Sequence, residues 1–260
     1  MQVNLTGKTA LVGGSSKGLG RAVAIALAQA GASVVVMARD IIALKELVEQ
    51  LPSQGQQHQF LVVDFSSFAS YKEKIDAFFQ KNSVDILVNN TQGPPAGHAI
   101  DLQVEDYQVA FDLLFKCAVH TTQRALPQMQ KKHWGRIINV SSVTVKEPLP
   151  QLALSNSVRA ALASWAKSLS LDVGSQGITV NTVLTGYFNT ARLRALNEAK
   201  AAATGQAFET VEQALIEKIP LRQLGDPTSY GALVTFLASA QASYITGTTI
   251  PIDGGVLQSY

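Results

Sequence analysis

The stretch "TALVGGSSKGLGRAVAIALAQAG", residues 9–31, sets the pattern for the whole chain. A short apolar run leads into a glycine-rich loop and then into a helical pattern, and the glycines at Gly14, Gly18 and Gly20 follow the spacing G-x-x-x-G-x-G. Glycines at such a turn let the backbone approach a diphosphate closely, while the helix N-terminus offers free N–H groups and a favourable dipole. Taken alone, the motif indicates either a phosphate-binding loop or only a tight turn.

Short apolar runs alternate with helical patterns along the rest of the chain. Runs rich in Val, Ile and Leu, without polar alternation, are typical of parallel strands that are buried on both faces of a sheet. Helices between such strands complete a doubly wound α/β architecture. We therefore predict a doubly wound parallel sheet, a Rossmann fold, with strands at residues 9–14, 33–38, 59–64, 86–90, 136–142, 178–184 and 248–253.

Three helical segments carry further signals. Asp226 stands before Pro227, the pattern of a helix cap followed by a first-turn proline. The pattern over residues 104–132 is long and contains Pro127, which we expect to bend the helix or divide it in two. The segment 187–219 inserts helix-forming sequence between two strands, at the end of the sheet where ligands bind in such folds. We interpret this insertion as a helical lid over a substrate.

Composition limits the class of protein. With 260 residues, 47% hydrophobic and 15% charged, the chain suits one domain spanning residues 1–260. The net charge is only +2, and the basic cluster "KKHWGR" at 131–136 fits a solvated helix end better than a nucleic-acid contact. The single cysteine, Cys117, excludes an internal disulfide, favours a reducing compartment and fits a packing role. The sequence has no signal-peptide pattern and no span-length apolar stretch. We predict a soluble cytoplasmic protein without nucleic-acid, membrane or metal binding.

Further motifs follow the strands in a fixed order. Asp64 ends "VVD", and Asn89 begins the sequence "NNTQG" after the fourth apolar run. With "GRIINVSS" at 135–142, "ITVNTVLTG" at 178–186 and "ITGTTIPIDGG" at 245–255, they resemble the short-chain dehydrogenase/reductase family over nearly the whole chain. Within that family the likeness is to the 3-oxoacyl-acyl-carrier-protein reductases.

The resemblance implies a dinucleotide site. It places the three loop glycines along the diphosphate, Asp64 at the adenine, Asn89 on the adenosine ribose side and Thr190 at the carboxamide. Three departures from the family pattern concern this site: Gly13 replaces a threonine, "NNTQG" replaces Asn-Asn-Ala-Gly, and Thr185 replaces a proline before Gly186. The predicted cofactor-binding residues are Gly14, Ser16, Lys17, Gly18, Leu19, Gly20, Arg39, Asp64, Asn89, Arg159, Gly186 and Thr190.

The choice of dinucleotide depends on charge at the end of the second strand. A carboxylate there would bind a ribose 2′-hydroxyl and repel a 2′-phosphate. The position holds Ala38, followed by Arg39, and Lys17 lies in the glycine-rich loop. These two cations favour NADP(H) over NAD(H), because each can pair with the phosphate. The opposing interpretation is that Arg39 is solvated and that Asp40 weakens its field.

The sequence keeps the spacing of the family's catalytic residues, but most of the residue types at those positions differ. The family has a serine after the fifth strand, a tyrosine thirteen residues later, a lysine four beyond that, and an asparagine on the preceding long helix. Ser142 matches the serine, while Ser155, Arg159 and Leu114 fall at the other three positions. The sequence therefore lacks the family's proton donor.

The replacements restrict what the site can do. The phenol of a tyrosine ordinarily has a pKa of about 10, whereas a serine hydroxyl is usually activated only by a neighbouring base. Arginine stays charged and can orient a ribose or polarise an oxygen, but it cannot exchange protons. Because the spacing puts Ser155 and Arg159 on one helical face, we predict a catalytic set of Ser142, Ser155 and Arg159. Candidate replacement donors are Tyr187, Lys146 and His98.

Three functions remain open from the sequence. The first is an NADP(H)-dependent oxidoreductase that acts on a small carbonyl or alcohol substrate, such as a 3-oxoacyl thioester, with a rebuilt active site. The second is a non-catalytic dinucleotide-binding protein, either a sensor or the inactive partner of an active subunit. The third is a non-redox enzyme such as a dehydratase or isomerase. The resemblance also implies a homo-oligomer, a dimer or tetramer, formed through the helices beginning near Glu105 and Leu154 and through the C-terminal residues 252–260.

Overall fold

A seven-stranded parallel sheet lies at the centre of the protein. The structure is a computed structural model and describes residues 3–259. The strands are ordered β3-β2-β1-β4-β5-β6-β7, and every neighbouring pair is parallel. The predicted doubly wound sheet is confirmed, with strands β1 Thr9–Val12, β2 Ser33–Ala38, β3 Gln59–Val62, β4 Ile86–Asn89, β5 Gly135–Ser142, β6 Ile178–Thr185 and β7 Thr249–Ile252.

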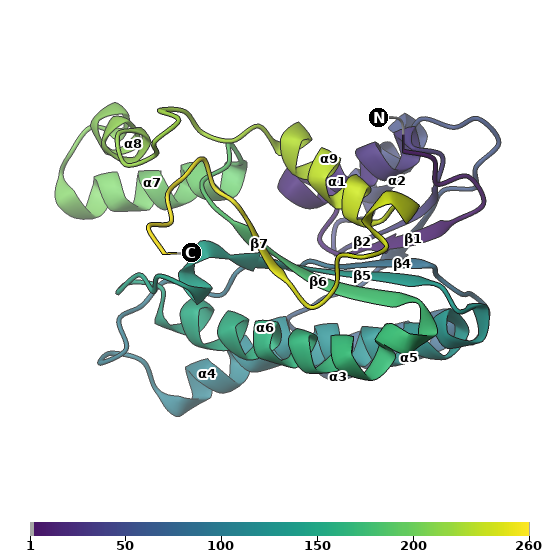
Figure 1. Cartoon of the computed structure of the whole chain (residues 1–260). Coiled ribbons are helices and arrows are strands. Elements are labelled where there is room, and N and C mark those ends of the chain that lie inside the picture. The colour runs from purple at the N-terminus through teal and green to yellow at the C-terminus, as the bar shows by residue number, and fades with distance from the viewer. Residues whose placement is uncertain (1–2, 260) are drawn as a thin grey trace.

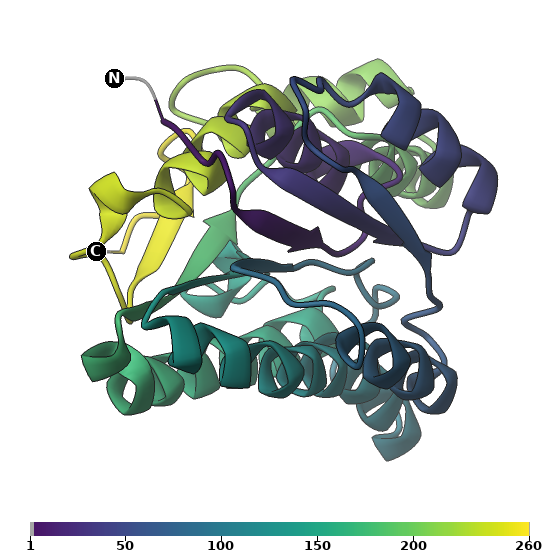
Figure 2. The same ribbon diagram turned by 90° about the vertical axis from the view of Figure 1, so that its right-hand side faces the viewer.

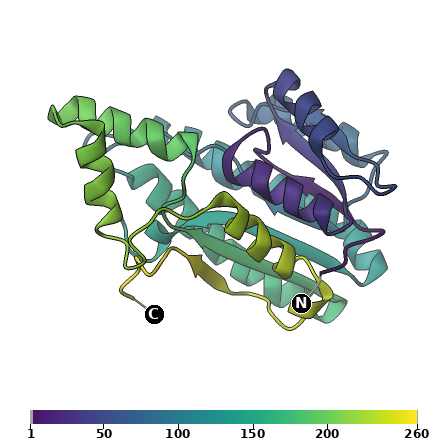
Figure 3. The ribbon, with the colours of Figure 1, turned by 90° about the horizontal axis from the view of Figure 1, so that it is seen from above.

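Helices cover both faces of this sheet (Figures 1 and 2). One layer contains α1 (Gly18–Gln29), α2 (Ile41–Gln50) and α9 (Pro227–Leu237). The other contains α3 (Phe68–Phe79), α4 (Val104–Phe111), α5 (Cys117–Lys132) and α6 (Ala153–Val173). Seen from above, α7 (Ala191–Thr204) and α8 (Phe208–Ile216) project beyond the sheet (Figure 3). Short 3-10 helices occur at η2 Val143–Val145, η3 Gly174–Gln176 and η4 Ala240–Ala242.

The strands lack polar alternation because both faces are buried. In β1, Ala10 and Val12 belong to the apolar core beneath α1, α2 and α9, whereas Leu11 belongs to the core on the side of α3, α5 and α6. A strand residue of either parity therefore enters an apolar core. This explains why the sequence shows continuous apolar runs rather than alternating ones.

The order of the strands reverses between β1 and β4. The chain runs outward from β1 to β3, then returns to β4 and continues in the other direction to β7. Ligands of open α/β sheets bind at such a switch point, outside the carboxyl ends of the strands. The loops after β1 and β4 meet there, since Asn90 Nδ2 donates to the Gly13 carbonyl at 3.0 Å.

The long helix departs from the prediction at Pro127. This proline lies inside α5, which continues to Lys132 without a break, so of the two expected outcomes, a bend or a division, the division is wrong and the bend stays a prediction. Pro127 and Gln123 are not buried, and water can therefore satisfy the carbonyl that loses its intrahelical partner. The irregularity occurs earlier, in the π-helical segment η1 (Asp112–Lys116) that separates α4 from α5.

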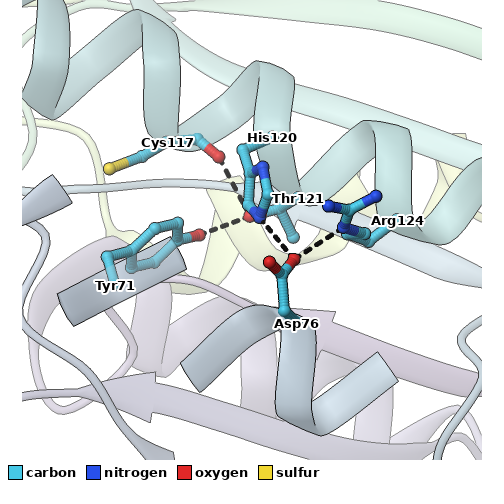
Figure 4. Close-up of polar contacts among 6 residues, drawn as sticks. All are labelled: Tyr71, Asp76, Cys117, His120, Thr121 and Arg124. Carbon is cyan, nitrogen blue, oxygen red and sulfur yellow. Dashed lines mark hydrogen bonds and ion pairs between the residues drawn. The ribbon is translucent and has the colours of Figure 1, made fainter. Parts of the chain in front are cut away.

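Polar contacts join α3 to α5 beside the apolar core (Figure 4). Asp76 accepts from Arg124 Nε at 2.6 Å and from His120 Nε2 at 2.8 Å. The Arg124 hydrogen bond, followed by that of His120, holds the pKa of Asp76 below its ordinary value. Next to them Cys117 is buried, and burial raises the pKa of its thiol to about 12, which agrees with the predicted packing role.

The remaining predictions about local structure concern helix ends. Asp226 caps α9 by accepting from Thr228 N, with Pro227 in the first turn, as expected. Lys131 and Lys132 occupy the last turn of α5, and Lys132 Nζ lies 2.7 Å from Asp85 Oδ1, so the basic cluster begins at a helix end as predicted. Within residues 3–259, no helix is long and apolar enough to cross a membrane. The same residues contain no cluster of three or more His, Cys, Asp or Glu side chains suited to a metal ion.

Candidate active site

The glycine-rich loop is closely packed where β1 meets α1. A Cβ added at Gly20 would lie 2.3 Å from the Gly14 carbonyl oxygen, and one at Gly13 would lie 2.2 Å from the Asn90 oxygen. Gly14 and Gly18 have φ angles of +55° and +58°, a conformation that side-chain-bearing residues rarely adopt. The loop therefore requires these glycines, and the close approach of the Asn90 backbone leaves no room for a side chain at Gly13.

Two polar side chains that the sequence analysis did not select hold this loop in place. Ser15 is fully buried; its Oγ donates to the Val12 carbonyl at 3.1 Å and accepts from Met37 N at 2.8 Å. Asn90 Nδ2 donates to the Gly13 carbonyl at 3.0 Å. The loop is thus fixed to β2 on one side and to the end of β4 on the other.

The N-terminus of α1 directly follows the glycine-rich turn. No side chain caps it, as is also true of α3, α6 and α8, whereas Asp40 caps α2 and Thr190 caps α7. The N-terminus of α7 faces the same loop, because Thr190 Cγ2 lies 3.7 Å from the position of a Cβ on Gly18. Uncapped N–H groups beside a glycine-rich turn form a favourable environment for a diphosphate. The loop residues therefore fit the diphosphate of a dinucleotide.

Arg39 and Asp64 lie together beyond the ends of β2 and β3. Arg39 Nε is 4.0 Å from Asp64 Oδ1, and its Nη2 donates to Gln92 Oε1 at 3.0 Å. A hydrogen bond from the Ser66 hydroxyl is the main cause that lowers the pKa of Asp64. Asp40 turns instead to the start of α2, where it accepts from two backbone N–H groups. The side chain of Asp40 is therefore engaged as a helix cap and not with Arg39, whose own contacts are with Asp64 and Gln92.

Other predicted cofactor residues lie around the crevice, the space outside the carboxyl ends of the strands where the loops after β1 and β4 meet. Asn89 Nδ2 donates to Thr122 Oγ1 at 3.1 Å and to Asn139 Oδ1 at 2.9 Å, so the amide hydrogens of Asn89 already have partners. Gly186 approaches the start of the C-terminal segment, where an added Cβ would lie 2.5 Å from Asp253 Cα. Within the glycine-rich loop, Lys17 is exposed and its neighbours are partly exposed, namely Ser16, Gly18 and Leu19.

Two of the three predicted catalytic residues, Ser155 and Arg159, are joined by a hydrogen bond, and Arg159 also contacts β5, the strand that ends at Ser142. Arg159 Nε donates to Ser155 Oγ at 3.2 Å, which confirms that these two residues share one face of α6. Its Nη1 donates to the carbonyl of Val140 at 2.8 Å, two residues before Ser142 at the end of the strand. The Ser142 Oγ accepts from Thr144 N at 3.2 Å, so its hydrogen is left for another acceptor.

The surroundings of Arg159 determine its charge state and the groups that it can act with. Burial lowers the pKa of the guanidinium to about 10, so it remains a cation at neutral pH. It lines a pocket with Asn90, Thr91 and Val140, and also with Leu114, which is buried within the π-helical segment. Because Leu114 offers no hydrogen-bonding group, this side of the pocket cannot relay a proton. Among residues 3–259, Arg159 is the only arginine, lysine, aspartate or glutamate that lines this pocket.

A second pair of hydroxyls lies beside this site. Thr185, the residue that stands where the family has a proline, pairs with Ser142 in the sheet. Its Oγ1 donates to the hydroxyl of Tyr230 at 3.0 Å, and Tyr230 is completely buried in α9. Burial raises the pKa of Tyr230, which keeps the phenol neutral. The sequence signalled Thr185 as a departure but gave no indication of its partner.

The candidate replacement donors lie in loops around the crevice. Tyr187 follows β6 and is partly buried, which raises its pKa. Lys146 ends the short helix η2, and His98 lies in the loop before α4. Within residues 3–259, none of the three side chains forms a hydrogen bond with the predicted catalytic residues. Each of the three remains a prediction.

The doubly wound sheet, the glycine-rich loop and the uncapped α1 define a Rossmann-fold nucleotide-binding protein. A family model described as "Enoyl-(Acyl carrier protein) reductase" matches residues 14–257. The protein "Oxidoreductase UcpA" of Salmonella typhimurium is 35% identical over 257 residues, which cover 96% of this chain and 95% of that protein. The 3-oxoacyl-(acyl-carrier-protein) reductase FabG of Rickettsia felis is 33% identical over 255 residues, covering 98% and 99%. The chain belongs to the short-chain dehydrogenase/reductase family.

Solved structures agree with this assignment. The NADPH dependent reductase YwfH, involved in bacilysin biosynthesis, superposes with a TM-score of 0.89 at 29% identity, covering 97% of this chain and 99% of YwfH. The L-sorbose reductase of Gluconobacter frateurii, complexed with NADPH and L-sorbose, gives a TM-score of 0.92 at 26% identity, with both chains fully covered.

Proposed function

We propose that the protein is an NADP(H)-dependent oxidoreductase that acts on a carbonyl or alcohol substrate with a non-standard active site. The observation that carries this proposal is the position of Arg159, a partly buried cation that donates to the Val140 carbonyl near the end of β5 and to Ser155 on α6. Similar proteins named as NADPH dependent reductase and L-sorbose reductase support the reaction class. The similarity to FabG supports a 3-oxoacyl thioester as one substrate.

The crevice residues supply binding and orientation. Bound NADP(H) would provide the hydride chemistry. The loop Gly14–Gly20 and the α1 N-terminus would hold its diphosphate, Asp64 its adenine and Thr190 its carboxamide. Arg39 and Lys17 would pair with the 2′-phosphate, because both are exposed cations at the outer end of the crevice.

Arg159 and Ser142 would act on the substrate oxygen. A guanidinium and a hydroxyl aimed at a carbonyl oxygen stabilise the negative charge that develops there during reduction. Neither group delivers a proton readily at neutral pH, so water would protonate the product. The site forgoes a general acid, whose contribution to rate is about 10² to 10⁴. We infer a slow enzyme that acts on a restricted set of substrates.

Helices α7 and α8 would form the lid over the substrate, within the segment 187–219. They project at the end of the molecule that carries Thr190 and the glycine-rich loop (Figure 3). Thr190 joins the cofactor site directly to the start of α7, so movement of this helix would change access to the crevice.

The test of the function is NADPH oxidation by the purified chain. We expect the absorbance of the reduced nicotinamide to decrease with at least one compound from a panel of ketones, aldehydes, sugars, free oxo acids and 3-oxoacyl thioesters. The competing function is a non-catalytic NADP(H)-binding protein, favoured by the buried Leu114 in place of a relay side chain. Saturable NADPH binding without turnover of any compound would replace the first function with the second.

Arg39 provides a test of cofactor choice. We expect Arg39→Ala to weaken NADPH binding roughly 10- to 100-fold, since a charge-assisted contact with the 2′-phosphate contributes about 1.5 to 3 kcal/mol. NADH lacks that phosphate, so its dissociation constant should change less than about twofold. Fluorescence titration of both nucleotides measures the two constants. An equal loss for NADPH and NADH would show that Arg39 does not contact the phosphate.

We propose that the chain forms a homo-oligomer. Val104 and Val109 on α4 and Leu171 on α6 are large apolar side chains with 60% to 75% of their surfaces exposed. Exposed apolar side chains on neighbouring helices are typical of subunit contacts. Multi-angle light scattering should give a mass of two or four chains, and the double variant Val104→Glu and Val109→Glu should reduce it. A wild-type mass of one chain would contradict the proposal.

A further inference from the structure

Arg192 lies in the first turn of α7 and reaches across the crevice. Its Nη2 donates to the Pro94 carbonyl at 3.1 Å, in the loop that follows β4. Gly93 lies beside the same nitrogen, since a Cβ added there would be in ordinary van der Waals contact with it at 3.7 Å. The first turn of α7 is thereby connected to the opposite side of the crevice.

The loop that Arg192 contacts also borders the catalytic residues. Its first residues, Asn90 and Thr91, line the pocket of Arg159. Further along, Gly97 forms a parallel bridge with Leu152, immediately before α6 begins. Arg192 and Arg159 therefore border the same short loop, the first along its middle and the second at its start.

Neither arginine has a carboxylate partner within residues 3–259. Other arginines of the chain do, because Arg124 pairs with Asp76 and Arg194 with Glu198. Two acidic side chains follow β5 and β7 near the carboxyl ends of these strands, which form the catalytic end of the molecule, and both already accept hydrogen bonds from backbone N–H groups. Glu147 accepts from the N–H groups of Gln258 and Ser259, and Asp253 accepts from those of Gly255 and Leu257.

The two cations also influence each other. Burial has the largest effect on the pKa of Arg159 and lowers it; Tyr230 acts in the opposite direction, and the charge of Arg192 lowers this pKa as a smaller effect. Two like charges that interact across a crevice raise the free energy of the ligand-free protein, and an anion placed between them lowers it. The catalytic end is therefore suited to a substrate that carries negative charge.

We propose that the substrate is an oxo acid, whose carboxylate binds Arg192 while its carbonyl oxygen lies against Arg159 and Ser142. This inference rests on the proposed function and restricts its substrate class. A guanidinium matches the planar geometry of a carboxylate, so the contact provides orientation as well as affinity. Free oxo acids are then better substrates than their neutral esters or the matching simple ketones.

Steady-state kinetics with matched pairs test the substrate class. Acetoacetate is compared with ethyl acetoacetate, and 2-oxobutyrate with 2-butanone, in wild type, Arg192→Gln and Arg194→Gln. We expect Arg192→Gln to raise the KM for the acids roughly 10- to 100-fold, with kcat and the values for the neutral compounds changed less than about threefold. Arg194→Gln, close to it in α7 and paired with Glu198, should behave as wild type. Equal losses for acids and neutral compounds, or no preference of wild type for acids, would overturn the inference.

Binding measurements separate this inference from the redox function. Calorimetry with the protein–NADP⁺ complex should detect saturable acetoacetate binding in wild type and not in Arg192→Gln, whether or not turnover occurs. Binding without turnover would retain the inference and reject the oxidoreductase, and turnover of neutral carbonyls without acid binding would do the reverse. NADPH titration of Arg192→Gln tests whether Arg192 binds a phosphate of the cofactor and not the carboxylate of the substrate. A loss of NADPH affinity comparable to the loss of acetoacetate affinity would show that Arg192 contacts a cofactor phosphate and would overturn the inference.

Discussion

Replacement of Arg159 by alanine is expected to lower kcat for NADPH-dependent reduction about 100- to 1000-fold. This is the range observed when one donor to a developing oxyanion is removed from an active site. The substitution would remove the only charged side chain of the pocket among residues 3–259, and would leave the Val140 carbonyl and Ser155 Oγ without their donor. The proposed chemistry depends on this cation because Leu114 and Ser155 cannot replace it.

Single-turnover and steady-state measurements separate chemistry from binding in this variant. Arg159→Lys retains a cation but loses the two-pronged contact with Val140 and Ser155, so we expect it to keep more activity than Arg159→Ala. NADPH titration and thermal unfolding of both variants control for loss of the cofactor or the fold. A kcat for Arg159→Ala within about threefold of wild type would reject the assigned role.

Replacement of Gly20 by alanine is expected to weaken NADPH binding about 100-fold or more. The new Cβ would lie 2.3 Å from the Gly14 oxygen and 2.8 Å from Asn90 Nδ2, so the loop must move. A displaced loop loses hydrogen bonds from its backbone to the charged diphosphate, and the loss of two such bonds costs about 3 kcal/mol. This free energy corresponds to roughly 100-fold in the dissociation constant.

Gly174→Ala is the matched control, because no atom lies within 4 Å of the position of its Cβ and its φ is −58°. Fluorescence titration with NADPH compares the two variants, and circular dichroism checks that both retain the fold. An NADPH affinity of folded Gly20→Ala equal to that of Gly174→Ala would show that the loop does not bind the diphosphate.

The sequence predicts that the candidate active site departs from the family pattern in several positions. In that prediction Ser155, Arg159 and Leu114 occupy the tyrosine, lysine and asparagine positions, and Thr185 occupies the position of the proline before Gly186. The structure joins two of these by a hydrogen bond, Arg159 to Ser155, and gives Thr185 a buried partner in Tyr230. These contacts are consistent with a rebuilt site in which hydroxyl groups and a fixed cation replace the proton-transferring pair.

Local patterns in the sequence were sufficient to predict much of this protein. Continuous apolar runs specified parallel strands, since a strand buried on both faces needs apolar residues of both parities. The cap of α9 and the glycine spacing of the first loop depend on neighbours within a few residues, as does the shared face of Ser155 and Arg159. Each of these features is determined by backbone geometry over one or two turns.

Only the tertiary structure decided the contacts between distant segments. Tyr230 meets Thr185 across 45 residues, and Arg192 meets Pro94 across 98. The exclusion of a side chain at Gly13 comes from the Asn90 backbone beyond another strand, and the helix irregularity occurs at residues 112–116 rather than at Pro127. Such contacts depend on how packed layers fix the positions of whole strands and helices, and no local periodicity carries that information.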